Sequence, residues 1–263
     1  MTADEKRNPR KGIYVLPNIL TTASLFLGFM GIMWAIEGDY TATSWAILGS
    51  CIFDGLDGKV ARMTNTTSEF GVQLDSLADL VAFGVTPAVM VYLWQLSEFG
   101  RLGLMASFLF IACGALRLAR FNVTTAKISK KFFIGLPIPA AACTLASTYL
   151  ASTYLSPALA QTVLPTLCLV LAYLLSFLMV STIRFFSFKE FGYFRAHSFS
   201  TMVVAILVFV LVASRPRLLL FAFFMGYIGW GISYTLFYLA RRGSRLTVEK
   251  HHDKSHEDQS SEE

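Results

Sequence analysis

The segment Asp54-Gly-Leu-Asp57-Gly58-Lys-Val-Ala61-Arg62, followed after eight residues by Gly71-Val-Gln-Leu-Asp75-Ser-Leu-Ala-Asp79, places four carboxylates inside or beside long apolar runs. An ionised carboxylate near lipid costs free energy unless another group compensates its charge. A divalent cation is the partner that suits several carboxylates at helical spacing, and such a cation would in turn hold a phosphate-rich substrate. The segment therefore predicts two neighbouring membrane helices with a charged site between them.

The composition around this segment is typical of a membrane protein. Of the 263 residues, 55% are hydrophobic and only 15% are charged, whereas a soluble domain carries about 25% charged residues. We expect an all-α, polytopic bundle of about eight transmembrane helices, a number that follows from apolar stretches near 16–36, 42–60, 76–96, 103–121, 137–155, 162–183, 199–214 and 217–240. The predicted domains are a basic N-terminal segment (1–15), a transmembrane domain (16–241) and a charged, disordered tail (242–263).

Basic residues indicate the orientation of this bundle. If both termini lie on one side of the membrane, that side holds all of the 22 Lys and Arg residues except Arg101, Arg215 and Arg217. Positive charge gathers on the cytoplasmic side, so we expect both termini and the aspartates to face the cytoplasm from the inner membrane. The net charge of +5 fits this topology and attraction to anionic lipid. A nucleic-acid partner is not expected, because the chain offers no soluble basic domain.

The spacing of the aspartates predicts how they meet. Asp54 and Asp57 are three residues apart and Asp75 and Asp79 are four apart, so each pair shares one helix face. The polar segment 63–69 is expected to turn the chain, which makes an antiparallel hairpin and brings the two pairs together. Four close carboxylates repel one another, and one or two divalent cations would relieve this. Oxygen ligands suit hard ions, so Mg²⁺ or Mn²⁺ is expected.

Small and basic residues accompany the carboxylates. Gly58 and Ala61 leave a gap on the side of Asp54, where a bulky polar group could approach the backbone. Arg62 can pair with a phosphate oxygen, and Gly71 lies one turn before Asp75 on the second helix. Taken alone, the small residues would be explained by close helix packing. Their fixed spacing from the carboxylates and Arg62 favours a metal-bridged pyrophosphate as the ligand.

At every specified position, these residues match the signature D-x-x-D-G-x-x-A-R, eight residues, then G-x-x-x-D-x-x-x-D. The chain therefore resembles the CDP-alcohol phosphotransferase family. The resemblance implies that Asp54, Asp57 and Asp75 bind metals that hold the diphosphate of a CDP-linked lipid. It implies that Asp79 completes the metal site and acts as general base. The residues implied to bind the CDP-lipid are Asn18, Thr21, Asp54, Asp57, Gly58, Ala61, Arg62, Gly71 and Asp75.

Asn18 and Thr21 enter this set through a weaker motif. The segment Pro17-Asn18-Ile-Leu-Thr21 resembles the part of the family that reaches the same pocket. Pro17 and Asn18 are equally suited to starting a helix, so the motif has a structural explanation as well. For the family, the resemblance implies attack of a hydroxyl on the β-phosphorus of CDP-diacylglycerol with release of CMP, two metal ions and a homodimer.

Three further segments resemble the phosphatidylserine synthase branch of the family. They are Gly114-Ala-Leu-Arg117-Leu-Ala-Arg120-Phe-Asn122, Lys130-Lys131-Phe-Phe-Ile-Gly135-Leu-Pro137-Ile-Pro139 and Ser181-Thr-Ile-Arg184-Phe-Phe-Ser-Phe-Lys189. The implied acceptor is L-serine, whose carboxylate requires fixed positive charge beside the attacked phosphorus. Arg117 and Arg120 share a helix face, and Lys131 and Arg184 are nearby candidates; we expect Arg120 to be the main one. Each of them could instead anchor a helix end among anionic headgroups.

Two rival interpretations stay open at this point. The same chemistry could use another acceptor, such as glycerol 3-phosphate or an inositol phosphate, or an archaeal-type lipid donor, because a phosphomonoester also needs a cluster of basic residues. A cation-coupled transporter is the alternative from another class, since intramembrane aspartates are typical of ion pathways. The transporter interpretation gives Gly58, Ala61 and Arg62 no role.

Overall fold

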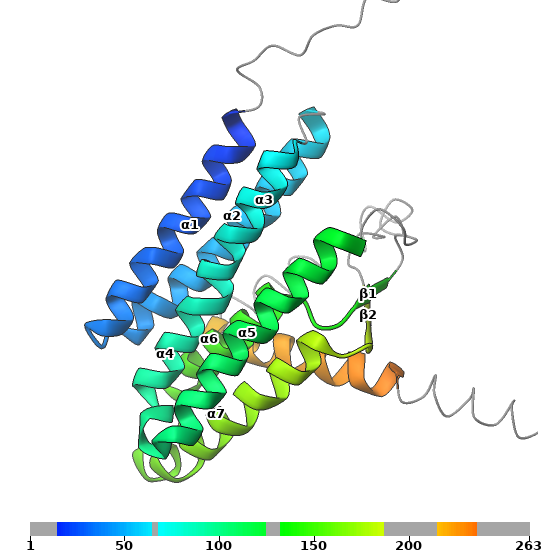
Figure 1. Cartoon of the computed structure of the whole chain (residues 1–263). Helices are drawn as coiled ribbons and strands as arrows, with labels where there is room; N and C mark the ends of the chain where they lie inside the picture. The colour runs from blue at the N-terminus through cyan, green and yellow to red at the C-terminus, as the bar shows by residue number, and fades with distance from the viewer. Residues whose placement is uncertain (1–14, 65–67, 125–131, 187–214, 236–263) are drawn as a thin grey trace, which may run out of the picture.

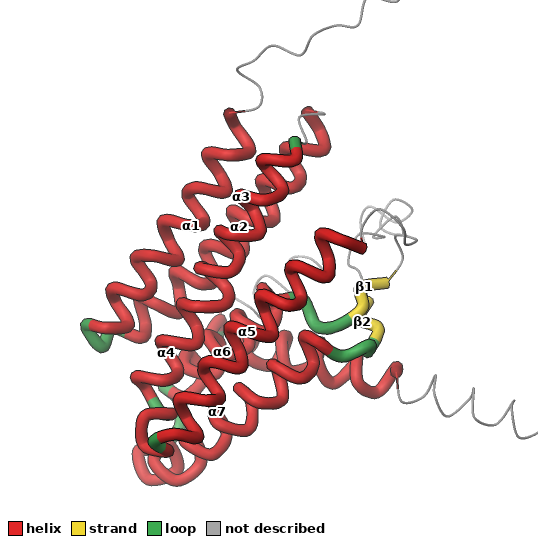
Figure 2. Tube along the Cα trace, viewed as in Figure 1, coloured by secondary structure: helices red, strands yellow, loops and turns green. Residues whose placement is uncertain are grey.

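The computed structural model describes residues 15–64, 68–124, 132–186 and 215–235, which form a helical bundle with one small sheet (Figures 1 and 2). In chain order the elements are α1 (Val15–Ile36), α2 (Tyr40–Thr64), α3 (Glu69–Asp79), the π-helical turn η2 (Leu80–Val85), α4 (Thr86–Trp94), the 3-10 turn η3 (Leu96–Phe99), α5 (Arg101–Thr124), β1 (Phe132–Ile134), α6 (Ile138–Ser152), α7 (Pro157–Val180), β2 (Arg184–Phe186) and a last helix, Pro216–Thr235.

Helices α1 and α2 form an antiparallel hairpin that small polar residues hold together (Figure 1). The Ser24 hydroxyl donates to the Ser50 carbonyl oxygen at 3.3 Å, and the Ser50 hydroxyl donates to the Ser24 carbonyl oxygen at 3.1 Å. Thr43 donates to the carbonyl oxygen of Gly31 at 3.0 Å. Small side chains let two backbones approach, and such hydrogen bonds stabilise helix pairs where lipid supplies no hydrophobic drive. The hairpin fixes α2, which carries the first two aspartates.

The second pair of aspartates lies on a helix that changes its winding directly after Asp79. Helix α3 runs into the π-helical turn η2 and then into α4, so that Glu69–Trp94 is one continuous span. A side chain at Gly28 of α1 would meet the Cα of Ala82 at 2.7 Å, so the two helices touch at η2. The Thr86 hydroxyl lies 2.9 Å from the carbonyl oxygens of both Gly28 and Val81. This contact ties the end of the π-helical turn to α1.

Helix α6 forms the centre of the bundle. Most of its residues are buried, from Ile138 to Leu150, and they contact α2, α4, α7 and η2. The largest fully buried side chains around it include Phe83 of η2 and Phe110 of α5. The bundle therefore closes around α6, and α1, α5 and α7 present apolar side chains such as Phe29, Phe108 and Phe177 outward, as expected of lipid-facing helices.

The expected membrane helices are confirmed in part. Five helices of the described ranges are long and apolar enough to cross a membrane, Leu16–Ile36, Glu69–Trp94, Arg101–Val123, Pro157–Val180 and Pro216–Thr235. The expected spans at 42–60 and 137–155 are helical, but α2 is charged in its second half, and α6 has only 15 residues. At about 1.5 Å per residue, α6 is shorter than a bilayer core of about 30 Å. The protein is an integral membrane protein, and a total of eight spans stays a prediction because 199–214 lies outside the described residues.

The break between the second and third helices falls within the polar segment 63–69 that was expected to turn the chain. Helix α2 continues to Thr64 and α3 begins at Glu69, so both helices extend a little beyond the apolar stretches 42–60 and 76–96. Ser68 explains this start, because its side chain accepts a hydrogen bond from the Gly71 N–H at 3.0 Å and so caps α3. The predicted N-terminal segment (apart from Val15) and the predicted tail lie outside the described residues.

The expected all-α fold class is confirmed, and one short pair of strands accompanies the helices. Strands β1 and β2 pair antiparallel, with Phe133 opposite Phe185, beside the ends of α5 and α7 (Figure 2). Gly135 follows β1 with φ of +82°, a conformation that favours glycine, and Pro137 is extended before α6 begins. A helix cannot pass through these two residues, so the chain between α5 and α6 takes strand geometry instead. These angles fix the direction in which the chain enters α6.

Candidate active site

Three of the four aspartates come together between α2 and α3, two helices that both pack against α1. One carboxylate oxygen from each of Asp54, Asp57 and Asp75 lies within 4.8 Å of the others. Asp57 is buried, and Asp54 and Asp75 are half-buried. Oxygen atoms at this separation, from groups that repel one another when ionised, form a donor set that fits a hard divalent cation. Of the four carboxylates that the spacing predicted to meet, these three form the close group.

Helix α1 supplies the groups that hold this cluster in place. The Thr21 hydroxyl, itself buried, donates to Asp57 Oδ2 at 2.6 Å and lies 3.1 Å from the Pro17 carbonyl oxygen. A side chain added at Gly71 would meet Asn18 Oδ1 at 3.4 Å, so Asn18 lies beside the start of α3. The structure thus places Thr21 at the cluster and Asn18 beside it. A hydrogen bond such as that from Thr21 orients the carboxylate that accepts it, here Asp57.

Asp79 lies beside the three clustered carboxylates but is not one of them. Its carboxyl group is close enough to that of Asp54 to share a hydrogen bond, and it is half-buried at the last residue of α3. The π-helical turn begins at the next residue, and such turns often occur at functional sites because they alter the direction of side chains. Asp79 therefore has a position distinct from the metal-competent triad.

The small residues of the signature border the cluster. Gly58 follows Asp57, and the nearest atoms to a side chain added there would be the guanidinium nitrogens of Arg62, at 3.6 and 4.0 Å. The exposed Arg62 therefore folds back along α2 toward the gap at Gly58, and its charge acts on Asp57. Ala61 lies one turn after Asp57 on the same helix. No helix packs tightly on Gly58, so the packing explanation for this glycine has no contact to support it within the described ranges.

Arg117 of α5 is a buried basic side chain that faces Asp54 and Asp79. It is only 8% exposed, and its charge acts on Asp79 and Asp54. Its Nε atom is buried and has no hydrogen-bond partner in the part of the chain that the structure describes. A buried guanidinium with an unused donor is costly, and an anionic ligand would satisfy it.

Arg120, one turn further along α5, has a different environment. Its guanidinium donates to three carbonyl oxygens at the end of α7, those of Val180 at 3.0 Å, Met179 at 3.3 Å and Ser181 at 3.4 Å. The last carbonyls of a helix lack partners within the helix, and a cation there satisfies them. These contacts make Arg120 a cap of α7, and its expected role as the main acceptor-binding residue stays a prediction.

The other two candidates for the acceptor site are less defined. Lys131 lies outside the described residues, and Arg184 is described only through the backbone of β2, where it pairs with Ile134 of β1. The strand β2 follows the helix end that Arg120 caps. Both expectations stay predictions.

One polar contact at the site was not expected from the sequence. The Asn122 side-chain amide donates to the Ser76 hydroxyl at 2.9 Å, and Ser76 lies next to Asp75. This bond joins the end of α5, which carries Arg117, to the acidic helix α3. Asn122 and Ser76 are 46 positions apart, and no spacing rule within a helix relates them, so the sequence held no signal for the pair.

Comparisons with known proteins agree with this arrangement. A family model described as CDP-alcohol phosphatidyltransferase matches residues 14–178. The chain is 39% identical over 233 residues to a CDP-diacylglycerol–serine O-phosphatidyltransferase of Helicobacter pylori, which covers 89% of this chain and 96% of the relative. It is 40% identical over 172 residues to a protein of the same name from Methanocaldococcus jannaschii, covering 62% of this chain and 74% of the relative. An archaetidylserine synthase of Methanothermobacter thermautotrophicus is 40% identical over 137 residues, 51% of this chain and 58% of the relative.

Proposed function

The chain belongs to the CDP-alcohol phosphatidyltransferase family, and on that premise we propose that it transfers a phosphatidyl group from CDP-diacylglycerol to the hydroxyl of L-serine. The products are phosphatidylserine and CMP. The observation that carries the proposal is the triad of carboxylate oxygens from Asp54, Asp57 and Asp75 within 4.8 Å, bordered by the open gap at Gly58. The names of relatives that match most of the chain support serine as the acceptor.

The donor would bind through its diphosphate at the triad. Asp54, Asp57 and Asp75 would hold Mg²⁺ or Mn²⁺, two ions in all, with Asp79 at the edge of the site. When bound, the ions would neutralise the diphosphate and stabilise the negative charge that develops on its oxygens. Arg62 would contact a phosphate oxygen, and the cytidine would pass over Gly58 and Ala61. Asn18, Thr21 and Gly71 would border the same pocket and keep Asp57 and α3 in position.

The serine hydroxyl oxygen would attack the β-phosphorus of the donor. A new P–O bond to serine forms, the bond from that phosphorus to the CMP oxygen breaks, and the hydroxyl proton passes to a carboxylate. We assign this proton to Asp79, because it lies beside the triad without being part of it. A base placed in this way contributes about 10²–10⁴-fold to a rate.

Arg117 is the residue best placed to bind the serine carboxylate. It is buried, faces Asp54 and Asp79, and has a free Nε donor within the described ranges. Its positive charge would also offset the cluster while the site is empty of donor. Arg120, Lys131 and Arg184 would contribute to the basic surroundings, Arg120 through its hold on α7.

The location of the site suits its substrates. The acyl chains of the donor would stay in the lipid beside α1–α3, and the water-soluble serine would enter from the cytoplasm. The basic residues counted above favour an inner membrane with the acidic site and both termini on the cytoplasmic side. A homodimer is part of the proposal because family members commonly associate in that way.

An acceptor panel tests the proposal. The purified protein would be mixed with CDP-diacylglycerol and labelled serine, glycerol 3-phosphate or inositol phosphate, with Mg²⁺, with Mn²⁺ or with EDTA. We expect phosphatidylserine and CMP in equal amounts from serine, no product with EDTA, and recovery when either ion is added back. Consumption of glycerol 3-phosphate without any phosphatidylserine would contradict the acceptor, and full activity in EDTA would contradict the metal site. Cation flux into vesicles without CMP release would instead support a transporter.

A further inference from the structure

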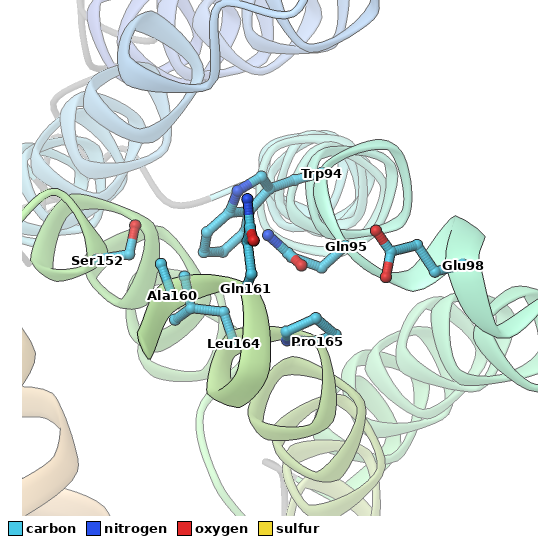
Figure 3. Close-up of a pocket in the computed structure, with 8 residues that line it drawn as sticks. All are labelled: Trp94, Gln95, Glu98, Ser152, Ala160, Gln161, Leu164 and Pro165. Carbon is cyan, nitrogen blue, oxygen red and sulfur yellow. The ribbon is translucent and has the colours of Figure 1, made fainter. Parts of the chain in front are cut away.

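A polar cavity lies at the other end of the bundle from the aspartates. It has a volume of about 260 Å³ and is formed where α4 and η3 meet the end of α6 and the start of α7 (Figure 3). Tyr40, the first residue of α2, contacts Tyr149 next to this cavity, and Asp54 lies about 20 Å further along α2 at about 1.5 Å per residue. The residues that line the cavity are Trp94, Gln95, Glu98, Ser152, Ala160, Gln161, Leu164 and Pro165.

The chemistry of this cavity favours a cationic group. Glu98 is the charged residue among those that line it, and its carboxylate makes no ion pair or side-chain hydrogen bond within the described part of the chain. Gln95 and Glu98 extend from one wall, and Gln161 extends from the other wall beside the Trp94 indole (Figure 3). Tyr149 holds that indole in an edge-to-face contact with ring centroids 4.9 Å apart. A carboxylate, amide oxygens and an aromatic ring are the groups that bind an ammonium ion.

The position of the cavity in the membrane suits a lipid headgroup. The span Glu69–Trp94 ends at the cavity, the span Arg101–Val123 begins next to it, and Pro157–Val180 begins on its other wall. The cavity therefore lies at the level of a membrane surface, where Trp side chains are common. Arg217 of the last helix lies 3.4 Å from the Thr153 hydroxyl, next to the lining residue Ser152. Arg217 therefore lies close to a cavity that suits a cation. This arrangement fits a ligand whose ammonium binds in the cavity and whose phosphate lies near the arginine.

We propose that this cavity binds the headgroup of a zwitterionic phospholipid with a primary ammonium, phosphatidylethanolamine. The ammonium would donate hydrogen bonds to Glu98 and to the side-chain oxygens of Gln95 and Gln161, with Trp94 behind it, and the phosphate would lie toward Arg217. A headgroup without an amine, such as that of phosphatidylglycerol, lacks the positive charge that Glu98 attracts, and the headgroup of phosphatidylserine adds a carboxylate that Glu98 would repel. The volume is below the range of about 300–1,000 Å³ for cavities that hold drug-sized ligands, so a headgroup with its acyl chains left in the membrane is a better fit than a nucleotide.

Lipid binding to the full-length protein tests the proposal. The delipidated protein in detergent would be titrated with dioleoylphosphatidylethanolamine, its choline analogue or dioleoylphosphatidylglycerol, and bound lipid counted by native mass spectrometry alongside thermal unfolding. We expect the ethanolamine lipid to bind at least tenfold more tightly than the glycerol lipid and to raise the unfolding temperature. The choline lipid should bind more weakly than the ethanolamine lipid, because a quaternary ammonium has no hydrogen to donate to the amides.

The variant Glu98→Gln should lose the preference for ethanolamine by about tenfold or more, as expected when a charge-assisted hydrogen bond is removed. The matched control is Glu37→Gln, an exposed carboxylate between α1 and α2 at the same end of the bundle, which should keep the preference. CMP release with serine should be the same in both variants, because neither residue is at the acidic site. Equal binding of the ethanolamine and glycerol lipids by the unaltered protein, or an undiminished preference in Glu98→Gln, would overturn the proposal.

Discussion

The acidic faces of α2 and α3 and the basic end of α5 meet at one end of the bundle, but different kinds of contact build them. The acids converge because each pair is spaced at three or four residues on its own helix and one turn joins the two helices. The two arginines of α5 are also three residues apart, yet they separate. Arg117 faces Asp54 and Asp79, whereas Arg120 donates to the end of α7. Two residues on the same helix face therefore bind the same ligand only when they also face the same neighbouring surface.

This comparison predicts that the two regions respond differently to single substitutions. On the acidic side, Asp79→Asn should lower the rate of CMP release about 10³-fold or more, because the amide cannot take the proton of the serine hydroxyl. Binding of CDP-diacylglycerol and of the metal should change little, since Asp79 is outside the triad of carboxylates. Steady-state rates of CMP release measure the effect on turnover, and equilibrium binding of CDP-diacylglycerol measures the effect on the donor site.

Asp39→Asn is the matched control for Asp79→Asn. Asp39 accepts a hydrogen bond from the Ala42 N–H at 2.9 Å at the start of α2, and asparagine caps a helix equally well. The Asp39→Asn variant should therefore release CMP at the unaltered rate. Normal turnover in Asp79→Asn would remove this residue as the base, and a loss of metal binding equal to that of Asp57→Asn would place it among the metal ligands.

The acidic site was largely predictable because its determinants are local. Asp54, Asp57 and Asp75 lie on two helices that are close together in the sequence, so their spacing alone predicted that they meet. The small residues Gly58 and Gly71 were predictable for the same reason. Arg120 was not, because its partners are the carbonyl oxygens of α7, about 60 residues later in the chain. The sequence marks a basic helix end but does not say which surface will face it.

The irregular elements of the fold could not be predicted from the sequence either. Nothing in Leu80–Val85 distinguishes a π-helical turn from an α-helix, and it forms where Gly28 and Thr86 bring α1 close to Ala82. The β1–β2 sheet depends on pairing across the whole of α6 and α7. Helix α6 has an apolar sequence like a membrane span, but it is buried at the centre and ends at Ser152. Each of these features depends on contacts between distant segments rather than on composition.

On the basic side, Arg117→Gln should raise the KM for serine about 10–100-fold and change the KM for CDP-diacylglycerol much less. Losing a charge-assisted hydrogen bond to the serine carboxylate weakens binding by about this factor. Arg101→Gln, at the exposed opposite end of α5, is the matched control and should leave both constants unaltered. An equal rise in both constants for Arg117→Gln would indicate general damage to the site rather than loss of an acceptor contact.

A smaller effect is expected from the hydroxyl that orients the metal ligand Asp57. Thr21→Val keeps the shape of the side chain but removes the 2.6 Å hydrogen bond to Asp57 Oδ2. The activating concentration of Mg²⁺ should rise about tenfold, the lower end of what such orienting partners contribute. Thr22→Val is the control, because among the described residues the Thr22 hydroxyl bonds only to the Asn18 carbonyl oxygen of its own helix. An unchanged Mg²⁺ requirement in Thr21→Val would mean that Asp57 needs no support from α1.

The smallest effect on catalysis is expected at Arg120, and it is the sharpest test of the comparison. Arg120→Gln removes a charged donor from the last carbonyls of α7, at a cost of about 1–3 kcal/mol of stability. The unfolding temperature should fall, while the KM for serine should change by less than about threefold, the reverse of the pattern for Arg117→Gln. Arg120→Lys should recover part of the stability, because one ammonium can still donate to these carbonyls. If Arg120→Gln instead raised the KM for serine as much as Arg117→Gln without lowering stability, the two arginines would act as one acceptor site, and the division between them would fail.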